Sequence, residues 1–142
     1  MKDAFGGILN IFIIVVVLIL IEGLLGLVVN YTKAFRMKNY IISAFEEFEA
    51  SHCGDNEASA CHRAIVDKAK ELGFSRNNKL ECPLNYENGK GFFCYQDKWH
   101  DSDGNYIYSI EVQIDINIPI VRNIMGMSIF RVRGDTRVIN KK

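Results

Sequence analysis

One uninterrupted apolar run constrains this chain more than any other feature. Residues 8–29 read ILNIFIIVVVLILIEGLLGLVV and carry one formal charge, on Glu22. As a helix, a run of this length reaches about 33 Å, which is enough to cross the hydrocarbon core of a bilayer. The run is rich in β-branched residues, but a bilayer forces every backbone group to pair internally, and a single segment achieves this only as a helix. We therefore expect residues 1–30 to form one transmembrane anchor.

A cleavable secretory signal is the competing interpretation of this run. The apolar region of such a signal usually has about 7 to 15 residues and ends at a site of the A-x-A type. The run here is longer, and no such site follows it. These differences favour a retained anchor.

Charge and motifs narrow the classes of function. Seventeen basic and seventeen acidic side chains cancel, so no net charge attracts the protein to nucleic acid. The sequence has no G-x-S-x-G motif, no H-E-x-x-H motif and no glycine loop of the phosphate-binding type. We expect no catalytic residues, no cofactor and no nucleic-acid partner.

Four cysteines, Cys53, Cys61, Cys82 and Cys94, follow the anchor. An even number in a small domain indicates two disulfides and an oxidising compartment. Zinc is the alternative, since His52 and His62 adjoin two of the cysteines, but paired C-x-x-C motifs are missing. Of the three possible pairings we favour Cys53 with Cys61 and Cys82 with Cys94, because each pair brackets a short, turn-rich segment.

The two signals for membrane orientation disagree. Lys33, Arg36 and Lys38 follow the anchor, and the positive-inside rule would place them in the cytoplasm. Disulfides place the same part of the chain outside. We give the cysteines more weight, because the basic residues continue an amphipathic helix that a protein assembly could hold. The expected topology is a single-pass protein with a cytoplasmic N-terminus and an extracytoplasmic domain.

The anchor helix is predicted to continue beyond the membrane. Between Leu27 and Cys53 there is neither proline nor glycine, and apolar residues recur at steps of three or four. This stripe comprises Tyr31, Ala34/Phe35, the aliphatic stem of Lys38, Ile41/Ile42, Phe45 and Phe48. The result is a rod of some forty residues whose second half, residues 31–50, has one apolar face and needs a partner surface.

A small antiparallel sheet in residues 91–140 is the predicted partner. Residues 106–118 alternate apolar and polar, with Tyr106, Tyr108, Ile110, Val112, Ile114, Ile116 and Ile118 on one face. The opposite face carries Ser109, Glu111, Gln113, Asp115 and Asn117. GFFCYQDKW before it and SIFRVRGDTRVI after it supply further strands, the latter around a turn at Gly134–Asp135.

A second, short helix is expected in the connecting region, residues 51–90. The segment ACHRAIVDKAKELGF has apolar residues at helical spacing, and Gly73 near its end is expected to be the C-cap of the helix. The predicted class is therefore α+β: an anchor over 1–30 and one extracytoplasmic domain over 31–142, with its sheet packed on the rod.

Glu22 is the most informative single residue of the anchor. A carboxylate within an apolar span is costly and normally finds a partner inside protein, which would set the register between packed helices. A protonated or snorkelling carboxyl without a role is the alternative. Gly23 and Gly26 beside it, with Gly6 and Gly7 earlier, would permit close helix approach, although the pattern is not G-x-x-x-G.

Three short motifs have simpler explanations. DSDGN at 101–105 resembles the start of a calcium loop, but Val112 replaces the expected glutamate, so a hairpin turn is favoured. Arg133-Gly134-Asp135 matches an adhesion tripeptide that a turn explains. Asn30-Tyr31-Thr32 matches a glycosylation sequon but adjoins the membrane within the helix.

The layout as a whole resembles the TadE-like pseudopilins of tight-adherence, type IV-related pilus systems. The resemblance is carried by the early glycine pair, the apolar span, the unbroken helix through NYTKAFRMKNYII and the terminal segment IPIVRNIMGMSIFRVRGDTRVI. It implies a structural subunit, inserted by its N-terminal helix, processed by a prepilin peptidase after a glycine and extracted into or beneath a filament. Its partners would be other copies or pilin-like subunits and the pilus assembly machinery.

The resemblance has one departure in sequence. Cleavage after Gly6 or Gly7 would make Ile11 or Phe12 the fifth mature residue, where type IV pilins commonly have glutamate, and Glu22 lies too far along to replace it. The leading hypothesis is a minor pilin or pseudopilin of a pilus or secretion apparatus. The alternative is a membrane-anchored extracellular binding domain that does not polymerise.

Overall fold

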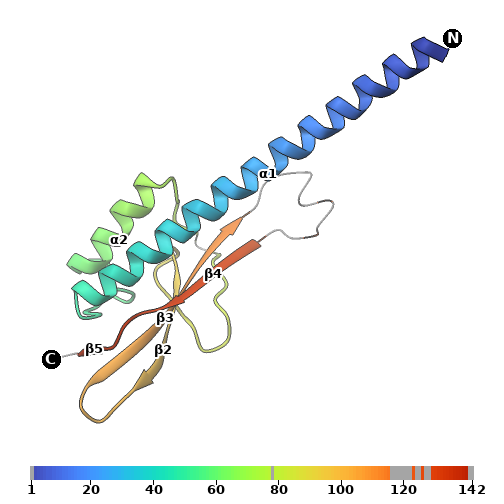
Figure 1. Cartoon of the computed structure of the whole chain (residues 1–142). Coiled ribbons are helices and arrows are strands. Elements are labelled where there is room, and N and C mark those ends of the chain that lie inside the picture. The colour runs from blue at the N-terminus through green and yellow to red at the C-terminus, as the bar shows by residue number, and fades with distance from the viewer. Residues whose placement is uncertain (1, 78, 116–122, 124–125, 127–128, 141–142) are drawn as a thin grey trace.

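The computed structural model describes residues 2–77, 79–115, 123, 126 and 129–140. Its helices are α1 (Lys2–Glu47) and α2 (Ala60–Glu71). Its strands are β1 (Glu87–Asn88), β2 (Cys94–His100), β3 (Asn105–Asp115), β4 (Ile129–Asp135) and β5 (Ile139–Asn140). Figure 1 shows α1 as one rod, whose C-terminal half lies against the sheet and α2 while its N-terminal half projects away. The α+β class, with a long apolar helix, a short second helix and a small antiparallel sheet, is confirmed.

The buried stripe of α1 follows the helical spacing expected from the sequence. Ala34, Lys38, Ile41 and Phe45 are buried as predicted, with Ile41 fully inaccessible to solvent. The Lys38 ammonium group lies 4.3 Å from the centre of the Phe35 ring, so the aliphatic stem is covered while the charge meets an aromatic face. Met37 and Ala44, which the predicted stripe did not include, are buried too. Tyr31 and Phe35 are 44% and 43% exposed and form the edge of the stripe.

The helix ends at Glu47, three residues earlier than predicted, although no glycine stops it. Glu49 and Ala50 both adopt positive φ angles, of 50° and 54°. The Ala50 amide donates a hydrogen bond of 2.7 Å to the Phe45 carbonyl, which caps the last turn. This reversal turns the chain back along α1 towards α2.

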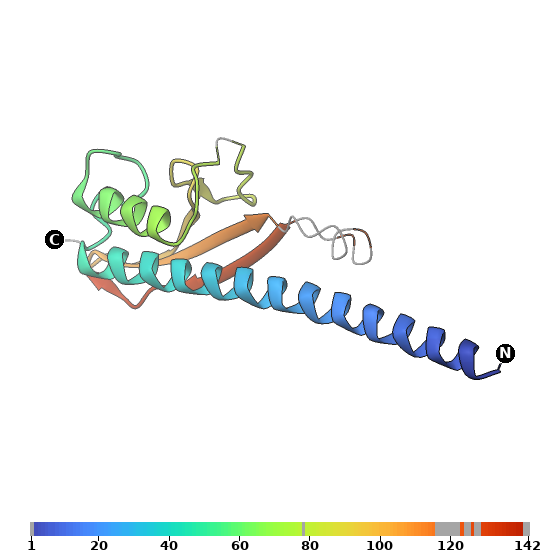
Figure 2. The ribbon, with the colours of Figure 1, turned by 90° about the horizontal axis from the view of Figure 1, so that it is seen from above.

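The sheet has the strand order β1-β2-β3-β4, and β5 pairs with the start of β3; all pairings are antiparallel. The β2–β3 connection is the hairpin expected at residues 101–105, with Gly104 at a φ of 81°. The sheet begins earlier than predicted, because Glu87 and Asn88 pair with β2. Both helices lie on one side of the long β3–β4 pair in Figure 1, and in the view of Figure 2 α1 crosses in front of β4. The predicted strand residues 116–118 lie outside the described residues.

The turn predicted at Gly134–Asp135 is wrong, because β4 continues through both residues. Gly134 pairs with Ile110 and Asp135 with Ser109, and the chain turns only afterwards. A Cβ atom at Gly134 would lie 2.9 Å from Ile42 Cδ1 and 3.0 Å from Lys38 Cδ. Gly134 therefore leaves room for the ends of the Ile42 and Lys38 side chains of α1, and it does not form a turn.

The core lies between α1, α2 and the inner face of the sheet. Phe45 is at its centre, with ring centroids 5.8 Å from Phe93, 5.9 Å from Tyr95 and 5.5 Å from Tyr108. Ile65 of α2 and Ile110 of β3 are fully buried around it. The inner face of β3 is thus the face predicted from the alternating pattern.

The outer face of β3 differs from the prediction of a solvent-exposed polar face. Ser109 and Glu111 are buried, at 4% and 1% exposure. The residues before β2 cover them: the Tyr86 hydroxyl donates to Ser109 Oγ at 2.9 Å, and Gln113 Nε2 donates to the Glu81 carbonyl at 2.8 Å. The alternation in the sequence does not reveal this cover, because it comes from a connecting segment without a regular pattern.

Candidate functional site

The N-terminal half of α1 is exposed on almost every side. Ile8 is 68% exposed, Phe12 66% and Leu24 61%, and the neighbouring large apolar residues are comparable. In the described part of the chain this is the one helix long and apolar enough to span a membrane. An apolar surface of this extent requires cover by lipid or by other protein.

The four glycines of this half do not share one face of the helix. At about 100° per residue, Gly23 and Gly26 lie on the side that continues into the buried stripe of Ala34 and Ile41, and both glycines are half-buried. Gly6 and Gly7 lie on other sides of the helix, at about 100° and about 160° from Gly23. A Cβ atom at Gly6, Gly7 or Gly23 would meet nothing within 4 Å. A helix neighbour could approach closely at either pair, but not along one continuous glycine face.

Glu22 lies at the edge of the Gly23–Gly26 side and is exposed. No hydrogen bond or ion pair to its carboxylate occurs among the residues that the structure describes. A carboxylate in this position must find its partner outside the described residues or lie at the water boundary.

The apolar half joins the domain without a linker. Tyr31, two residues after the end of the apolar run, packs edge-on against Phe130 at the start of β4, with ring centroids 5.4 Å apart. Tyr31 also stacks on Phe35 at 6.4 Å. Asp115, which ends β3, pairs with Ile129 at the same level. We call Tyr31, Lys33, Phe35, Ile129, Phe130 and Arg131 the junction edge of the domain.

The two disulfides follow the predicted pairing, Cys53–Cys61 and Cys82–Cys94. The first ties the reversal after α1 to the start of α2, where Ser59 Oγ accepts a hydrogen bond from the His62 amide as N-cap. The His62 ring is buried, with Nδ1 3.1 Å from the Cys53 carbonyl. With all four sulfurs in disulfides, the zinc alternative is not supported.

An ion cluster on the outer face of the sheet is the feature that sequence reasoning missed. The buried Glu111 carboxylate accepts from Arg133 at 2.8 Å, and Arg131 Nε lies 3.8 Å away. The hydrogen bond to Glu111 raises the pKa of Arg133, whose guanidinium also lies 5.0 Å from the Tyr86 ring. The cluster closes the outer face of the sheet, and its partners come from neighbouring strands, so only the register of β3 with β4 could have predicted it.

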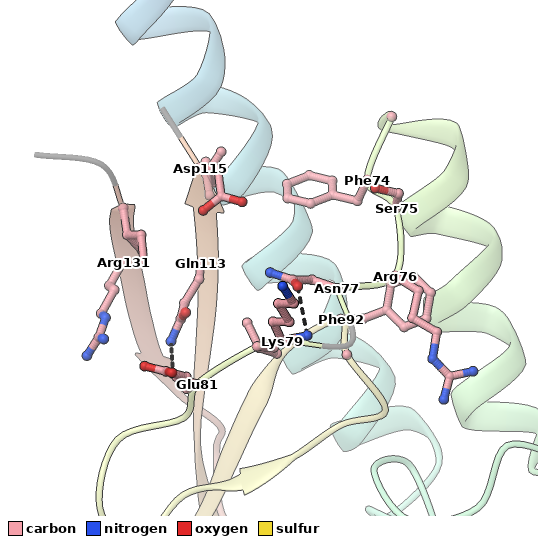
Figure 3. A pocket seen from close by; sticks show the side chains of 15 residues that line it. Phe74, Ser75, Arg76, Asn77, Lys79, Glu81, Phe92, Gln113, Asp115 and Arg131 are labelled. Atoms are coloured by element: carbon pink, nitrogen blue, oxygen red, sulfur yellow. Dashed lines mark hydrogen bonds between the residues drawn. The ribbon is translucent and has the colours of Figure 1, made fainter. Parts of the chain in front are cut away.

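A cleft of about 730 Å³ opens between the residues after α2 and the ends of β3 and β4 (Figure 3). Lys79, Asn77 and Glu81 line one side, and Gln113, Asp115 and Arg131 line the other. In Figure 3 the Gln113 amide points to the Glu81 carbonyl and so bridges the two sides. Positively and negatively charged side chains line this open cleft. Such a lining is more typical of a protein contact surface than of a catalytic pocket.

The comparisons with known proteins add no relative. The scan against protein-family models returned no match, and neither did the searches of curated proteins and of solved structures.

Proposed function

We propose that this chain is a pilin-like structural subunit of a type IV-related pilus or secretion apparatus. In this proposal α1 anchors it in the membrane, and the disulfide-bonded domain lies on the extracytoplasmic side. The observation that carries the proposal is the continuity of α1, since one helix provides both the apolar rod and the central element of the domain core. The proposed work is structural rather than enzymatic.

The continuity favours an assembling subunit over a simple tether. A binding domain that is only held near a membrane needs no rigid coupling to its anchor, and a flexible linker would serve. Here α1 passes from the apolar run into the core without a break, so a force or rotation applied to the rod reaches the domain. The small residues Gly23 and Gly26 and the carboxylate of Glu22 are the features through which such rods would pack side by side.

The disulfides support the extracytoplasmic placement. Cys53, Cys61 and Cys94 are buried within the domain, so both bridges are integral to its fold. Disulfides of this kind persist in oxidising compartments and are rare in the cytoplasm. The partners in this proposal are the membrane, further copies or other pilin-like subunits, the assembly machinery and a prepilin peptidase.

In vivo photo-crosslinking tests the proposal. A photoreactive residue is placed in turn at each position from Ile8 to Val29, and the same residue at Arg63, on the exposed side of α2, serves as control. We expect adducts with a second copy or with another pilin-like subunit that recur with the helical period. Absence of protein adducts along the whole rod would instead support the non-polymerising tether. The intact mass of the purified protein separately reports cleavage after Gly6 or Gly7.

A further inference from the structure

The position of the junction edge relative to the apolar run is fixed by the helix itself. Tyr31 lies about 3 Å beyond Val29 along the axis, and Phe35 about 9 Å beyond it. The headgroup layer on each side of a bilayer is roughly 5–8 Å thick. If residues 8–29 fill the hydrocarbon core, Tyr31 therefore lies within the headgroup layer. The Phe35 backbone lies at the outer limit of that layer, and its ring reaches back into it, because helical side chains lean toward the N-terminus.

The apolar side chains of the junction edge suit this depth. Tyr31, Phe35 and Ile129 remain 44%, 43% and 45% exposed although they adjoin a well-packed core. Aromatic side chains are enriched at the boundary between lipid and water, because their rings sit among the headgroups. Tyr31 and Phe130 hold β4 against α1 at this level, so the sheet cannot swing away from the surface.

Basic residues lie at the same level of α1 as these apolar groups but on other sides of the helix, Lys33 about 160° and Arg36 about 100° around the axis from Phe35. Lys33 and Arg36 are exposed on α1, and the Arg131 side chain is 49% exposed on β4. Arg133 makes the close contact with Glu111, so the more distant Arg131 keeps most of its hydrogen-bonding capacity. Asp115 and Glu81 are exposed carboxylates that line the same cleft as Arg131, and the exposed Lys79 lines it too (Figure 3). The cations named here thus outnumber the two carboxylates, which favours contact with phosphate groups.

We propose that the junction edge is a second membrane-contact surface, which sits in the headgroup layer and prefers anionic lipid. Tyr31, Phe35 and Ile129 provide the apolar contact, and Lys33 and Arg131 bind lipid phosphate. The inference rests on the anchoring of α1 in the proposed function but not on polymerisation. The domain would then stand in one fixed orientation on the bilayer before any assembly.

Depth-dependent quenching by brominated lipids tests the position, with one chain in each lipid nanodisc so that assembly plays no part. Three single-tryptophan proteins are compared: the native chain with Trp99, and the Phe35→Trp and Leu18→Trp variants, each in a Trp99→Phe background. We expect strong quenching of the Phe35→Trp protein by bromine near the headgroup end of the acyl chain. The Leu18→Trp protein should respond to bromine deep in the chain, and Trp99 to neither.

Each outcome of this experiment has a defined meaning. If the Phe35→Trp protein is as unquenched as native Trp99 while the Leu18→Trp protein is quenched, the inference is overturned and the anchor stands. If the Leu18→Trp protein is unquenched as well, both the inference and the proposed function fail. Ile129→Trp provides a second position on β4, so a folding defect of the Phe35→Trp chain does not decide the result.

Lipid preference is tested by native mass spectrometry of the protein titrated with phosphatidylglycerol or phosphatidylcholine. We expect tighter retention of phosphatidylglycerol, and a loss of about fivefold in that preference for each of Lys33→Gln and Arg131→Gln. Arg63→Gln removes a cation from the exposed side of α2 and should leave the preference unchanged. Equal retention of both lipids by the native chain, or equal losses in all three variants, would contradict the proposed recognition.

Discussion

The two halves of α1 have apolar residues of the same kinds but opposite surroundings. Ile14 is 53% exposed in the first half, whereas Ile41 is fully buried in the second. The difference lies in the pattern, since the first half is apolar on all sides and the second has one apolar stripe opposite polar residues. One continuous helix thus has an exposed apolar half and a half that packs in the domain core. Matched substitutions in the two halves separate the contribution of each half to domain stability.

The largest expected effect comes from the same truncation made in each half. Ile41→Ala should lower the free energy of unfolding of the domain by about 2–5 kcal/mol, because it leaves a cavity between α1 and the sheet. Ile14→Ala should change it by less than about 0.5 kcal/mol. Denaturant titration in detergent micelles, followed by Trp99 fluorescence, measures both. Similar losses for the two variants would mean that the first half also packs in a core.

Reduction of the disulfides should destabilise the domain around the second half of α1 and leave the first half of the helix folded. Each bridge closes a short loop, so its loss should cost about 2–3 kcal/mol of domain stability. The Cys82–Cys94 bridge should open first, since Cys82 is only half-buried whereas Cys53 and Cys61 are buried. Mass mapping of alkylated thiols gives the order, and circular dichroism in micelles should retain the signal of the apolar helix. Loss of all helical signal on reduction would contradict the separation.

Two glycine substitutions, one in the first half of α1 and one on the strand that faces its second half, give an intermediate effect. Gly134→Val should destabilise the domain by about 1 kcal/mol, because the ends of the Ile42 and Lys38 side chains would have to move away from the added side chain. Gly23→Val introduces the same side chain where a Cβ atom meets nothing within 4 Å, and domain stability should not change. Thermal unfolding of both variants in micelles is the measurement. A neutral Gly134→Val would show that the Ile42 and Lys38 side chains move aside without cost.

The smallest effect is a loss of stability at alkaline pH. Desolvation by burial raises the pKa of Tyr95 and of Tyr108 above the ordinary value of 10.0, and Glu87 raises that of Tyr95 further. Because the unfolded chain loses these protons first, stability should be constant below about pH 10 and fall above it. The slope can reach about 1.4 kcal/mol per pH unit for each tyrosine.

Tyr95→Phe is the control for this pH dependence. It removes one of the two titrating hydroxyls along with its 2.6 Å hydrogen bond to Glu87. Denaturant titrations at several alkaline pH values should show a shallower decline for this variant than for the native chain. An unchanged decline would assign the effect to other groups.

Sequence reasoning predicted the parts of the fold that depend on local pattern. The spacing from Ala34 to Phe45 gave the buried stripe of α1, Gly73 marked the end of α2, and short intervals gave the cysteine pairing. It failed where distant segments meet. The burial of Glu111 depends on Tyr86 and Arg133, and the role of Gly134 depends on Ile42 of α1.

Of the candidate site, the apolar run could likewise be predicted from the sequence and the junction edge could not. The apolar run is evident from composition alone, because a bilayer selects for hydrophobicity along a whole segment. The junction edge could not be predicted, since it forms only when Phe130 of β4 meets Tyr31 of α1. That contact joins residues at opposite ends of the chain.

Topology in the native membrane tests the central claim most directly, namely that α1 crosses the membrane and holds the domain outside it. An epitope tag with a protease site is appended after the C-terminus, and protease is added to cells whose inner membrane is intact but accessible. The account predicts that the tag is removed while a cytoplasmic marker survives, and that the protein sediments with membranes in alkaline carbonate. A tag protected until the membrane is lysed, or a protein released by carbonate, would contradict it.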